Sequence, residues 1–336
     1  METELERTTS TMNAVVQRSY GSAETLGHEE IPVPEAGPGE VLLEVHAAGV
    51  DRGVWHLMTG MPYLVRLAGF GVTKPKQPVP GLDMSGRVVA VGEGVERFRE
   101  GDEVFGIAGG AYAEYAVAKE EKLSSKPENL TYEQAAVASI SGITALQALT
   151  DVAGVQAGQS VLVIGASGGV GSYAVQIAKA LGTTVTGVAS SAKTDLVGSL
   201  GADHVIDYRV GDYLDGATKY DVIIDTGGRN PVRKLRRGLK KTGILVIVGG
   251  EGGNKLTGGT GRQVWAKLLS PFVSQQLTTF ISGESHRHID RLAEYLTSGD
   301  VVPAVGNRYD LETVGDAISD LEAGKAAGKS VVVIKK

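Results

Sequence analysis

The pattern of apolar and polar positions changes near Thr131. From Ala14 to about Lys126, short β-branched runs such as Val41 to Ala47 and Arg87 to Val91 alternate with glycine and proline turns. These runs predict antiparallel strands joined by short loops, and therefore a barrel-like region. The stretch from Trp55 to Pro80 shows no clean period and predicts no regular element.

After Thr131, apolar β runs alternate with longer helical patterns, which favours βαβ units and a parallel sheet. The apolar residues from Val170 to Leu181 recur at helical spacing, so one face of that helix can pack on the sheet. The strands predicted for the sheet span residues 160–166, 184–188, 204–207, 221–225, 244–248 and 277–281. A predicted helix at 288–298 is followed by a tail at 307–311, 313–322 and 330–334, which is expected to rejoin the first region.

Composition excludes several kinds of site. The 336 residues are enough for about two domains, and a net charge of -6 gives no overall attraction to nucleic acid or anionic lipid. With no cysteine, the chain can form no disulfide, thiolate nucleophile or cysteine-ligated zinc site. No apolar stretch approaches the roughly 20 residues that span a bilayer, and the first residues are polar. We therefore expect a cytoplasmic protein without nucleic-acid or membrane partners.

One segment carries specific chemistry. Residues 161–171 read VLVIGASGGVG, follow a predicted strand and open a predicted helix, which is the context that a dinucleotide-binding loop requires. Gly168 and Gly169 let the backbone approach a pyrophosphate, and Gly171 lets the helix pack closely on the strand. The alternative is a glycine-rich turn before a core helix. The loop is completed by Ala166, which stands in place of the first glycine, and by Ser167 and Val170.

The end of the second predicted strand bears on the choice of cofactor. A loop specific for NAD places Asp or Glu about 20 residues after the glycines, where it holds the ribose 2′-hydroxyl. Here that position carries Ser190, Ser191 and Lys193 and no carboxylate. Two hydroxyls and an ammonium favour a 2′-phosphate through charge-assisted contacts, so we predict NADPH. The alternative is that the serines cap the next helix and Lys193 is solvated.

Further segments agree with one family in order and spacing over nearly the whole chain. They read GEVLLEVHAAGVD (39–51), PGLDMSGRVVAVGEGVERFREGDEVFG (80–106), GAYAEYAVAKEEKLSSKP (110–127), SGITALQAL (141–149), SLGADHVIDY (199–208) and a closing GKSVVVI. With the dinucleotide loop, they resemble the medium-chain dehydrogenase/reductase superfamily, specifically its zinc-free quinone oxidoreductase branch. The resemblance implies an α/β fold: a GroES-like β-barrel catalytic domain and a Rossmann domain with a doubly wound parallel sheet, with a cofactor cleft where they meet.

The resemblance also sets expected domain boundaries. Residues 12–128 and 301–336 are expected to form the GroES-like catalytic domain, residues 129–300 the Rossmann NADP(H)-binding domain, and residues 1–11 a flexible extension. Similar reductases pair the last strands of their Rossmann sheets, so a homodimer is expected through Ile244 to Gly250 and Leu277 to Ser282.

Ligand positions of the wider family are changed in this chain. Zinc-bearing relatives carry Cys where this chain has Asp51, and a His-Glu pair where it has Leu82 and Asp83. Without the imidazole and every thiolate, no catalytic metal is expected. The resemblance further places Thr144 near the nicotinamide, Val248 and Gly249 at its carboxamide, and Tyr208 at the adenosine phosphate beside Ser190 and Lys193.

The expected chemistry follows from the missing metal. Without a Lewis acid, an electron-poor acceptor is favoured over an alcohol. Hydride from NADPH is expected to reach a quinone or the β-carbon of an α,β-unsaturated carbonyl, and His56, Tyr63 or water would supply a proton. Asp51 is a candidate for orienting the substrate or the proton donor. Asp51, His56 and Tyr63 each have a non-catalytic alternative, as a helix cap, a packing residue or a surface residue.

Two other functions stay open on the sequence. One is a zinc-independent alcohol or aldehyde dehydrogenase-like activity, and the other is a non-enzymatic NADPH-binding sensor or RNA-binding relative. The basic run from Arg229 to Lys241 is interpreted as a solvated helix face rather than a nucleic-acid patch.

Overall fold

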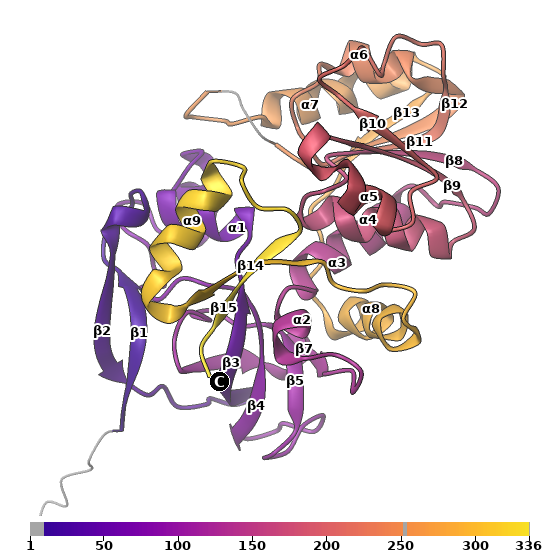
Figure 1. The fold of residues 1–336 in the computed structure, drawn as a ribbon. Coiled ribbons are helices and arrows are strands. Elements are labelled where there is room, and N and C mark those ends of the chain that lie inside the picture. The colour runs from indigo at the N-terminus through magenta and orange to yellow at the C-terminus, as the bar shows by residue number, and fades with distance from the viewer. Residues whose placement is uncertain (1–9, 251–253, 336) are drawn as a thin grey trace, which may run out of the picture.

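The computed structural model describes residues 10–250 and 254–335. Two β-rich bodies lie side by side, one built on a parallel sheet and the other on a mixed, barrel-like sheet (Figure 1). The strands are β1 (Thr11–Gln17), β2 (Leu26–Pro32), β3 (Glu40–Gly49), β4 (Asp83–Val91), β5 (Glu103–Ile107), β6 (Tyr115–Lys119), β7 (Leu123–Ser125), β8 (Ser160–Ile164), β9 (Thr184–Ala189), β10 (His204–Asp207), β11 (Tyr220–Asp225), β12 (Leu239–Ile247), β13 (Gln276–Thr279), β14 (Val305–Asp310) and β15 (Lys329–Val333).

Helices cover the parallel sheet and the boundary between the two bodies. They are α1 (Arg52–Thr59), α2 (Tyr132–Ala136), α3 (Ser139–Gln147), α4 (Gly169–Ala180), α5 (Thr194–Ser199), α6 (Val232–Arg237), α7 (Thr260–Leu269), α8 (His286–Ser298) and α9 (Val314–Glu322). Within the described ranges, no helix combines the length and the apolar character needed to cross a membrane.

The parallel sheet has the strand order β10-β9-β8-β11-β12-β13, and each neighbouring pair is parallel. The order runs outward in both directions from β8 and β11, so the sheet is doubly wound. Successive residues of β8 point to opposite faces. Val161 and Val163 pack with α3, α4 and α8, whereas Leu162 and Ile164 pack with α6 and α7. The predicted Rossmann arrangement is confirmed, with strand ends shifted by a few residues.

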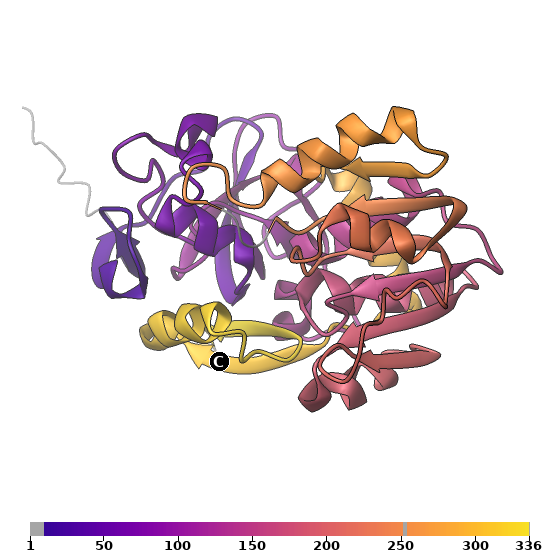
Figure 2. The ribbon, with the colours of Figure 1, turned by 90° about the horizontal axis from the view of Figure 1, so that it is seen from above.

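The second sheet has the order β14-β15-β3-β4-β5-β7, with β6 also paired to β3. Leu43 and Val45, on one face of β3, are fully buried in its core. The C-terminal β15 pairs antiparallel with β3, where Val332 lies opposite Ala48. The yellow C-terminal segment accordingly lies beside the indigo and purple N-terminal part in both views (Figure 2). The GroES-like fold and the expected return of the tail are therefore confirmed.

The region that the sequence leaves irregular contains most of α1. Asp51 caps this helix, because its Oδ1 accepts a hydrogen bond from the N–H of Val54 at 3.0 Å. Gly60 ends the helix in the left-handed conformation, with φ of 61°. An Asp at the N-cap and a Gly at the C-cap are recognised helix boundaries. These two signals identify α1, although its apolar residues show no clean period.

The first strand begins slightly earlier than expected. β1 starts at Thr11 rather than at Met12, because its pairing with β2 extends to Thr11 and Pro32. Residues 1–9 of the expected flexible extension lie outside the described residues.

The basic run is only partly a solvated helix face. α6 ends at Arg237, and the last two lysines of the run belong to β12. Arg237 pairs with Asp212 at 3.1 Å, and Lys240 pairs with Asp221 at 2.7 Å. Carboxylates from neighbouring segments, which the sequence could not place, balance much of this positive charge.

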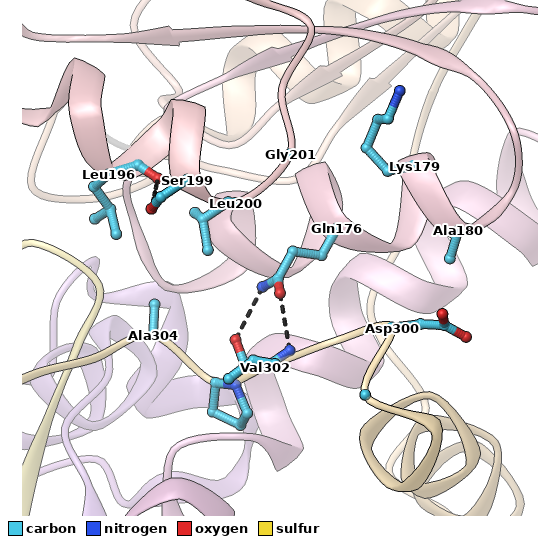
Figure 3. A pocket seen from close by; sticks show the side chains of 12 residues that line it. Gln176, Lys179, Ala180, Leu196, Ser199, Leu200, Gly201, Asp300, Val302 and Ala304 are labelled. Atoms are coloured by element: carbon cyan, nitrogen blue, oxygen red, sulfur yellow. Dashed lines mark hydrogen bonds between the residues drawn. The ribbon is translucent and has the colours of Figure 1, made fainter.

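The linker that leads from α8 back to β14 is fastened to α4. Gln176 accepts a hydrogen bond from the N–H of Val302 at 2.8 Å and donates one to its carbonyl at 3.1 Å (Figure 3). Linker residues 299, 300 and 302–304, with residues of α4 and α5, line a pocket of about 650 Å³. This pocket faces the middle and C-terminal end of α4, whereas the dinucleotide loop precedes the N-terminus of that helix.

Candidate active site

The dinucleotide loop lies at the carboxyl end of β8, where the strand order of the sheet reverses. The tight turn falls at Gly165, with φ of 82°, directly before Ala166, the residue that stands in place of the first glycine. The first backbone hydrogen bond of α4 runs from the N–H of Ser172 to the carbonyl of Gly168 at 2.9 Å. The N–H groups of residues 169–171 therefore precede the helical bonding pattern, and an anion in front of them meets donors and the positive end of the helix.

The loop glycines have different steric surroundings. A Cβ on Gly168 would meet only the carbonyl oxygen of Gly165, at 3.4 Å, so the space beyond it is open. A Cβ on Gly169 would lie 2.9 Å from the hydroxyl of Ser141, and one on Gly171 would lie 2.1 Å from the Gly165 carbonyl. Gly168 thus leaves room for a ligand, whereas Gly171 lets the helix pack against the strand.

The end of β9 carries the residues predicted to select the cofactor. Ser190 is buried and Ser191 is exposed. Lys193 donates hydrogen bonds to the carbonyls of Gly324 and Ala326, at 3.0 and 2.6 Å, from the segment between α9 and β15. Burial lowers the pKa of Lys193. This lysine therefore links the Rossmann sheet to the C-terminal segment of the chain.

The structure adds a carboxylate that sequence reasoning missed. Asp207 ends β10 and lies opposite Ala189 in the neighbouring strand. The hydroxyl of Ser191 donates to Asp207, and this hydrogen bond is the main cause that lowers the pKa of the carboxyl. Tyr208 is half exposed, with the Arg209 guanidinium 5.8 Å from its ring centroid. Strand pairing, which brings Asp207 to this edge, was the missing information.

Val248 and Gly249 follow β12, and both of their N–H groups donate to the carbonyl of Asp225, at 3.0 and 3.1 Å. Arg262 of α7, which sequence reasoning missed, donates to the Asp225 carboxylate at 2.6 Å and to the Gly249 carbonyl at 2.9 Å. Burial raises the pKa of Asp225, and Arg262 opposes that shift. The buried ion pair thus holds the loop at the ends of β11 and β12.

Thr144 lies at the same edge of the sheet. Its hydroxyl donates to the carbonyl of Ile140 at 2.6 Å and lies 3.2 Å from the hydroxyl of Ser282, which follows β13. Ser282 follows β13, which pairs with β12, the strand that precedes Val248 and Gly249. Thr144 is thus linked through Ser282 to the edge of the sheet where Val248 and Gly249 follow β12.

A buried group of charges lies between the two bodies; we call Asp51, Asp83 and Lys329 the charge cluster. The Lys329 ammonium donates to Oδ2 of Asp83 and lies 4.0 Å from Oδ2 of Asp51. Oδ1 of Asp83 accepts from the N–H of Ile140 at 2.8 Å, at the start of α3. Burial raises the pKa of Asp83 to about 6, with a smaller contribution from the Asp51 charge, and the Lys329 ammonium opposes the shift.

Lys329 connects the charge cluster with the dinucleotide loop. The N–H of the preceding Gly328 donates to the carbonyl of Ser167 at 3.1 Å. A Cβ on Gly169 would lie 4.0 Å from Cδ of Lys329, and one on Gly49 would lie 3.3 Å from its Cε. The lysine side chain thus runs from the dinucleotide loop past β3 to the two carboxylates.

The other two candidate catalytic side chains lie on and after α1. Nδ1 of His56 lies 2.7 Å from the carbonyl oxygen of Met61. Since a carbonyl oxygen only accepts, Nδ1 carries a hydrogen and donates a hydrogen bond to it. Nε2 of the neutral ring is then an acceptor, and it becomes a donor only when the ring is protonated. Tyr63 is 42% exposed. Its backbone N–H donates to the carbonyl of Lys255 at 2.9 Å, so this segment touches the loop after β12.

A mostly apolar cavity of about 280 Å³ is lined in part by α1. It shares α1 with the Asp51 cap, and it reaches Leu82, the neighbour of Asp83. A space of this size and character suits a small hydrophobic molecule. Its apolar lining includes Val54, Leu57, Met58, Phe70, Val79 and Leu82.

The residues do not fit a catalytic zinc ion. Across residues 10–250 and 254–335, no group of three or more His, Cys, Asp or Glu side chains is placed to hold a metal. At the positions where zinc-bearing relatives have ligands, the Lys329 ammonium contacts both Asp51 and Asp83. A fixed positive charge there opposes a divalent cation.

Two family models match the chain. One, described as an alcohol dehydrogenase GroES-like domain, matches residues 37–128, and the other, described as a zinc-binding dehydrogenase, matches residues 200–332. The chloroplastic quinone-oxidoreductase QR1 of Triphysaria versicolor is 33% identical over 96% of this chain and 98% of its own length. The 2-methylene-furan-3-one reductase of Solanum lycopersicum is 32% identical over 96% of this chain and 79% of its own length.

Solved structures are similar over almost the whole chain. The quinone oxidoreductase from Coxiella burnetii has a TM-score of 0.84 at 27% identity, covering 97% of this chain and 100% of its own. A mycobacterial protein in complex with NADPH has a TM-score of 0.80 at 28% identity, covering 96% and 99%. Fold, site and relatives together define an oxidoreductase that uses a nicotinamide cofactor. The chain belongs to the medium-chain dehydrogenase/reductase superfamily, in its quinone-oxidoreductase-like branch.

The contrast between two loop glycines gives a testable prediction. Gly168→Val should leave the melting temperature nearly unchanged but abolish dinucleotide binding, because its side chain enters open space that the phosphates need. Gly171→Ala is the matched variant and should destabilise the fold by about 1–3 kcal/mol, because its Cβ overlaps backbone. Thermal unfolding and fluorescence titration with NADPH measure both effects. Normal NADPH affinity in Gly168→Val would contradict this assignment of the loop.

Proposed function

We propose that this protein is a zinc-independent, NADPH-dependent reductase that transfers hydride to a quinone or to an α,β-unsaturated carbonyl. The observation that carries the proposal is the open dinucleotide loop at the carboxyl edge of the sheet, beside a charge cluster in which a lysine contacts both acids. The names of relatives add support, since they include a quinone-oxidoreductase and a 2-methylene-furan-3-one reductase.

The acceptor class is argued from what the site can supply. A bound nicotinamide would supply the hydride, so the chain has to orient the cofactor and the acceptor and to exclude water. With a lysine in place of a Lewis acid, a simple alcohol lacks the activation that its oxidation needs. The apolar cavity beside α1 would receive the electrophile, and protonated His56 or water would supply a proton to the product.

Two features at the end of β9 bear on the cofactor in opposite directions. Lys193 favours a 2′-phosphate, but it already donates to two carbonyls. Asp207 opposes the phosphate, yet Ser191 and the N–H of Arg209 both donate to it. We favour NADPH, because an ammonium can move to a stronger acceptor while the carboxylate stays bound to its donors.

A panel of acceptors tests the proposed reaction. Metal-free protein, prepared with a chelator, should oxidise NADPH with quinones or enones, and Gly168→Val should lose that activity. Efficient oxidation of a simple secondary alcohol without comparable quinone or enone reduction would favour the dehydrogenase-like alternative. NADPH binding without turnover of any acceptor, together with a gel shift on RNA, would favour the non-enzymatic alternative.

Paired variants test the cofactor preference. Wild type should bind NADPH more tightly than NADH, and Lys193→Ala should weaken NADPH binding about tenfold with little effect on NADH, because only NADPH carries the 2′-phosphate. Asp207→Asn should have the opposite effect and tighten NADPH binding a few-fold, because it removes a negative charge near the 2′-phosphate. Titration of both cofactors measures these constants, and equal affinities in wild type would remove the argument.

We also propose a homodimer formed at the free edge of the Rossmann sheet. β13 ends the strand order, and an edge strand offers unpaired N–H and C=O groups to a second copy. Ile281, just beyond the strand, is 97% exposed, and Trp265 and Leu268 of α7 are also exposed. Light scattering at micromolar concentration should report twice the chain mass of 35.0 kDa. A mass of one chain under these conditions would count against the dimer.

A further inference from the structure

The charge cluster holds more negative than positive charge in a place that excludes water. It contains two carboxylates and one ammonium, and none of the three side chains is more than 7% exposed. An uncompensated charge in such surroundings is strongly unfavourable, so each oxygen needs a partner.

The hydrogen bonds of the charge cluster leave one acceptor unfilled. Both oxygens of Asp83 are engaged, one by the N–H of Ile140 and the other by Lys329. Oδ1 of Asp51 accepts from the N–H of Val54. Oδ2 of Asp51 is buried and has no hydrogen-bond partner among the described residues. A donor from a bound molecule would satisfy it.

The position of this oxygen limits which molecule can reach it. Lys329, whose ammonium lies 4.0 Å from it, passes beside Gly169 of the dinucleotide loop. The oxygen and the loop therefore both lie close to the Lys329 side chain, the oxygen at Nζ and the loop at Cδ. A dinucleotide bound along the loop, or an acceptor next to its nicotinamide, can approach Asp51.

The cofactor and the acceptor differ in the hydrogen-bonding groups that they can offer to this oxygen. An ionised carboxylate only accepts hydrogen bonds. Quinones and enones present carbonyl oxygens, which are acceptors too and would be repelled. A nicotinamide dinucleotide presents ribose hydroxyls and a carboxamide N–H₂, which are donors. Asp51 therefore matches the cofactor and not the substrate.

We propose that Oδ2 of Asp51 accepts a hydrogen bond from a ribose hydroxyl of the bound dinucleotide, and that Lys329 is a positioning residue whose ammonium offsets the negative charge of the two carboxylates. This inference rests on the proposed use of a nicotinamide cofactor, but not on the identity of the acceptor. It assigns Asp51 to holding the cofactor rather than to supplying a proton.

The ammonium is what makes this arrangement stable. Without it, Asp51 and Asp83 would face each other as like charges, and one of them would take up a proton. A hydrogen bond from a hydroxyl to a neutral carboxyl is weaker than one to a carboxylate. Removing the Asp83 carboxylate together with the ammonium would remove this repulsion between like charges.

Fluorescence titration with NADPH and with NADH, in the absence of substrate, tests the proposal. Lys329→Met should weaken binding of both cofactors about tenfold, and adding Asp83→Asn should restore the affinity to within about threefold. Asp51→Ser keeps a capping oxygen for Val54 but removes Oδ2, so it should also weaken both cofactors about tenfold. The matched control is Lys335→Met. Lys335 lies in the same C-terminal segment as Lys329 but pairs with Glu44, so its loss should change the affinity for neither NADPH nor NADH.

Two results would overturn the inference. One is an Asp51→Ser variant that binds both cofactors within twofold of wild type, above all if its kcat for an enone falls, because Asp51 would then act as a proton source. The other is a Lys329→Met defect, in folding or in binding, that Asp83→Asn does not relieve, because Lys329 would then act through packing rather than charge. Since these titrations need no turnover, failure of the proposed reaction would leave their outcome readable.

Discussion

A buried ion pair between residues from opposite ends of the chain holds the site together. Lys329 begins the C-terminal strand β15, and Asp83 begins β4 in the N-terminal half. The same carboxylate receives the N–H of Ile140 at the start of α3, and the residue before the lysine binds the carbonyl of Ser167 in the dinucleotide loop. One charged contact thus fixes the barrel, helix α3 of the Rossmann part and the cofactor loop relative to one another.

Around that contact, the parallel sheet gathers chemistry from several strands at one edge. The glycine loop after β8, the serines and lysine after β9, Asp207 at the end of β10 and the Asp225–Arg262 pair beside β12 all lie where the strands end. Parallel strands bring their carboxyl ends to one side, so ligands bind there. One matching family model is described as a zinc-binding dehydrogenase. In this chain the positions of the zinc ligands carry Asp51 and Asp83, and the Lys329 ammonium lies beside both.

The sequence by itself determined the architecture and the place of the cofactor loop, because both depend on local patterns. Alternating apolar residues define strands such as Ser160–Ile164, and helical spacing defines α4. Glycine spacing in residues 161–171 specifies a strand, a tight turn and a helix within a dozen residues. The same local reasoning overlooked α1, whose boundaries are marked only by Asp51 and Gly60.

Only the tertiary structure decided which distant side chains meet. Asp207 reaches Ser191 because β10 pairs with β9, and Arg262 reaches Gly249 because α7 packs beside the end of β12. In the sequence, nothing distinguishes Lys329 from the other lysines near the C-terminus. In the fold, β15 pairs with β3, and Lys329 is buried against Asp51 and Asp83. Such contacts join residues that are far apart in the chain. Hydrophobic periodicity indicates which face of a helix or strand is buried, but it does not indicate which charged side chains the packed elements bring together.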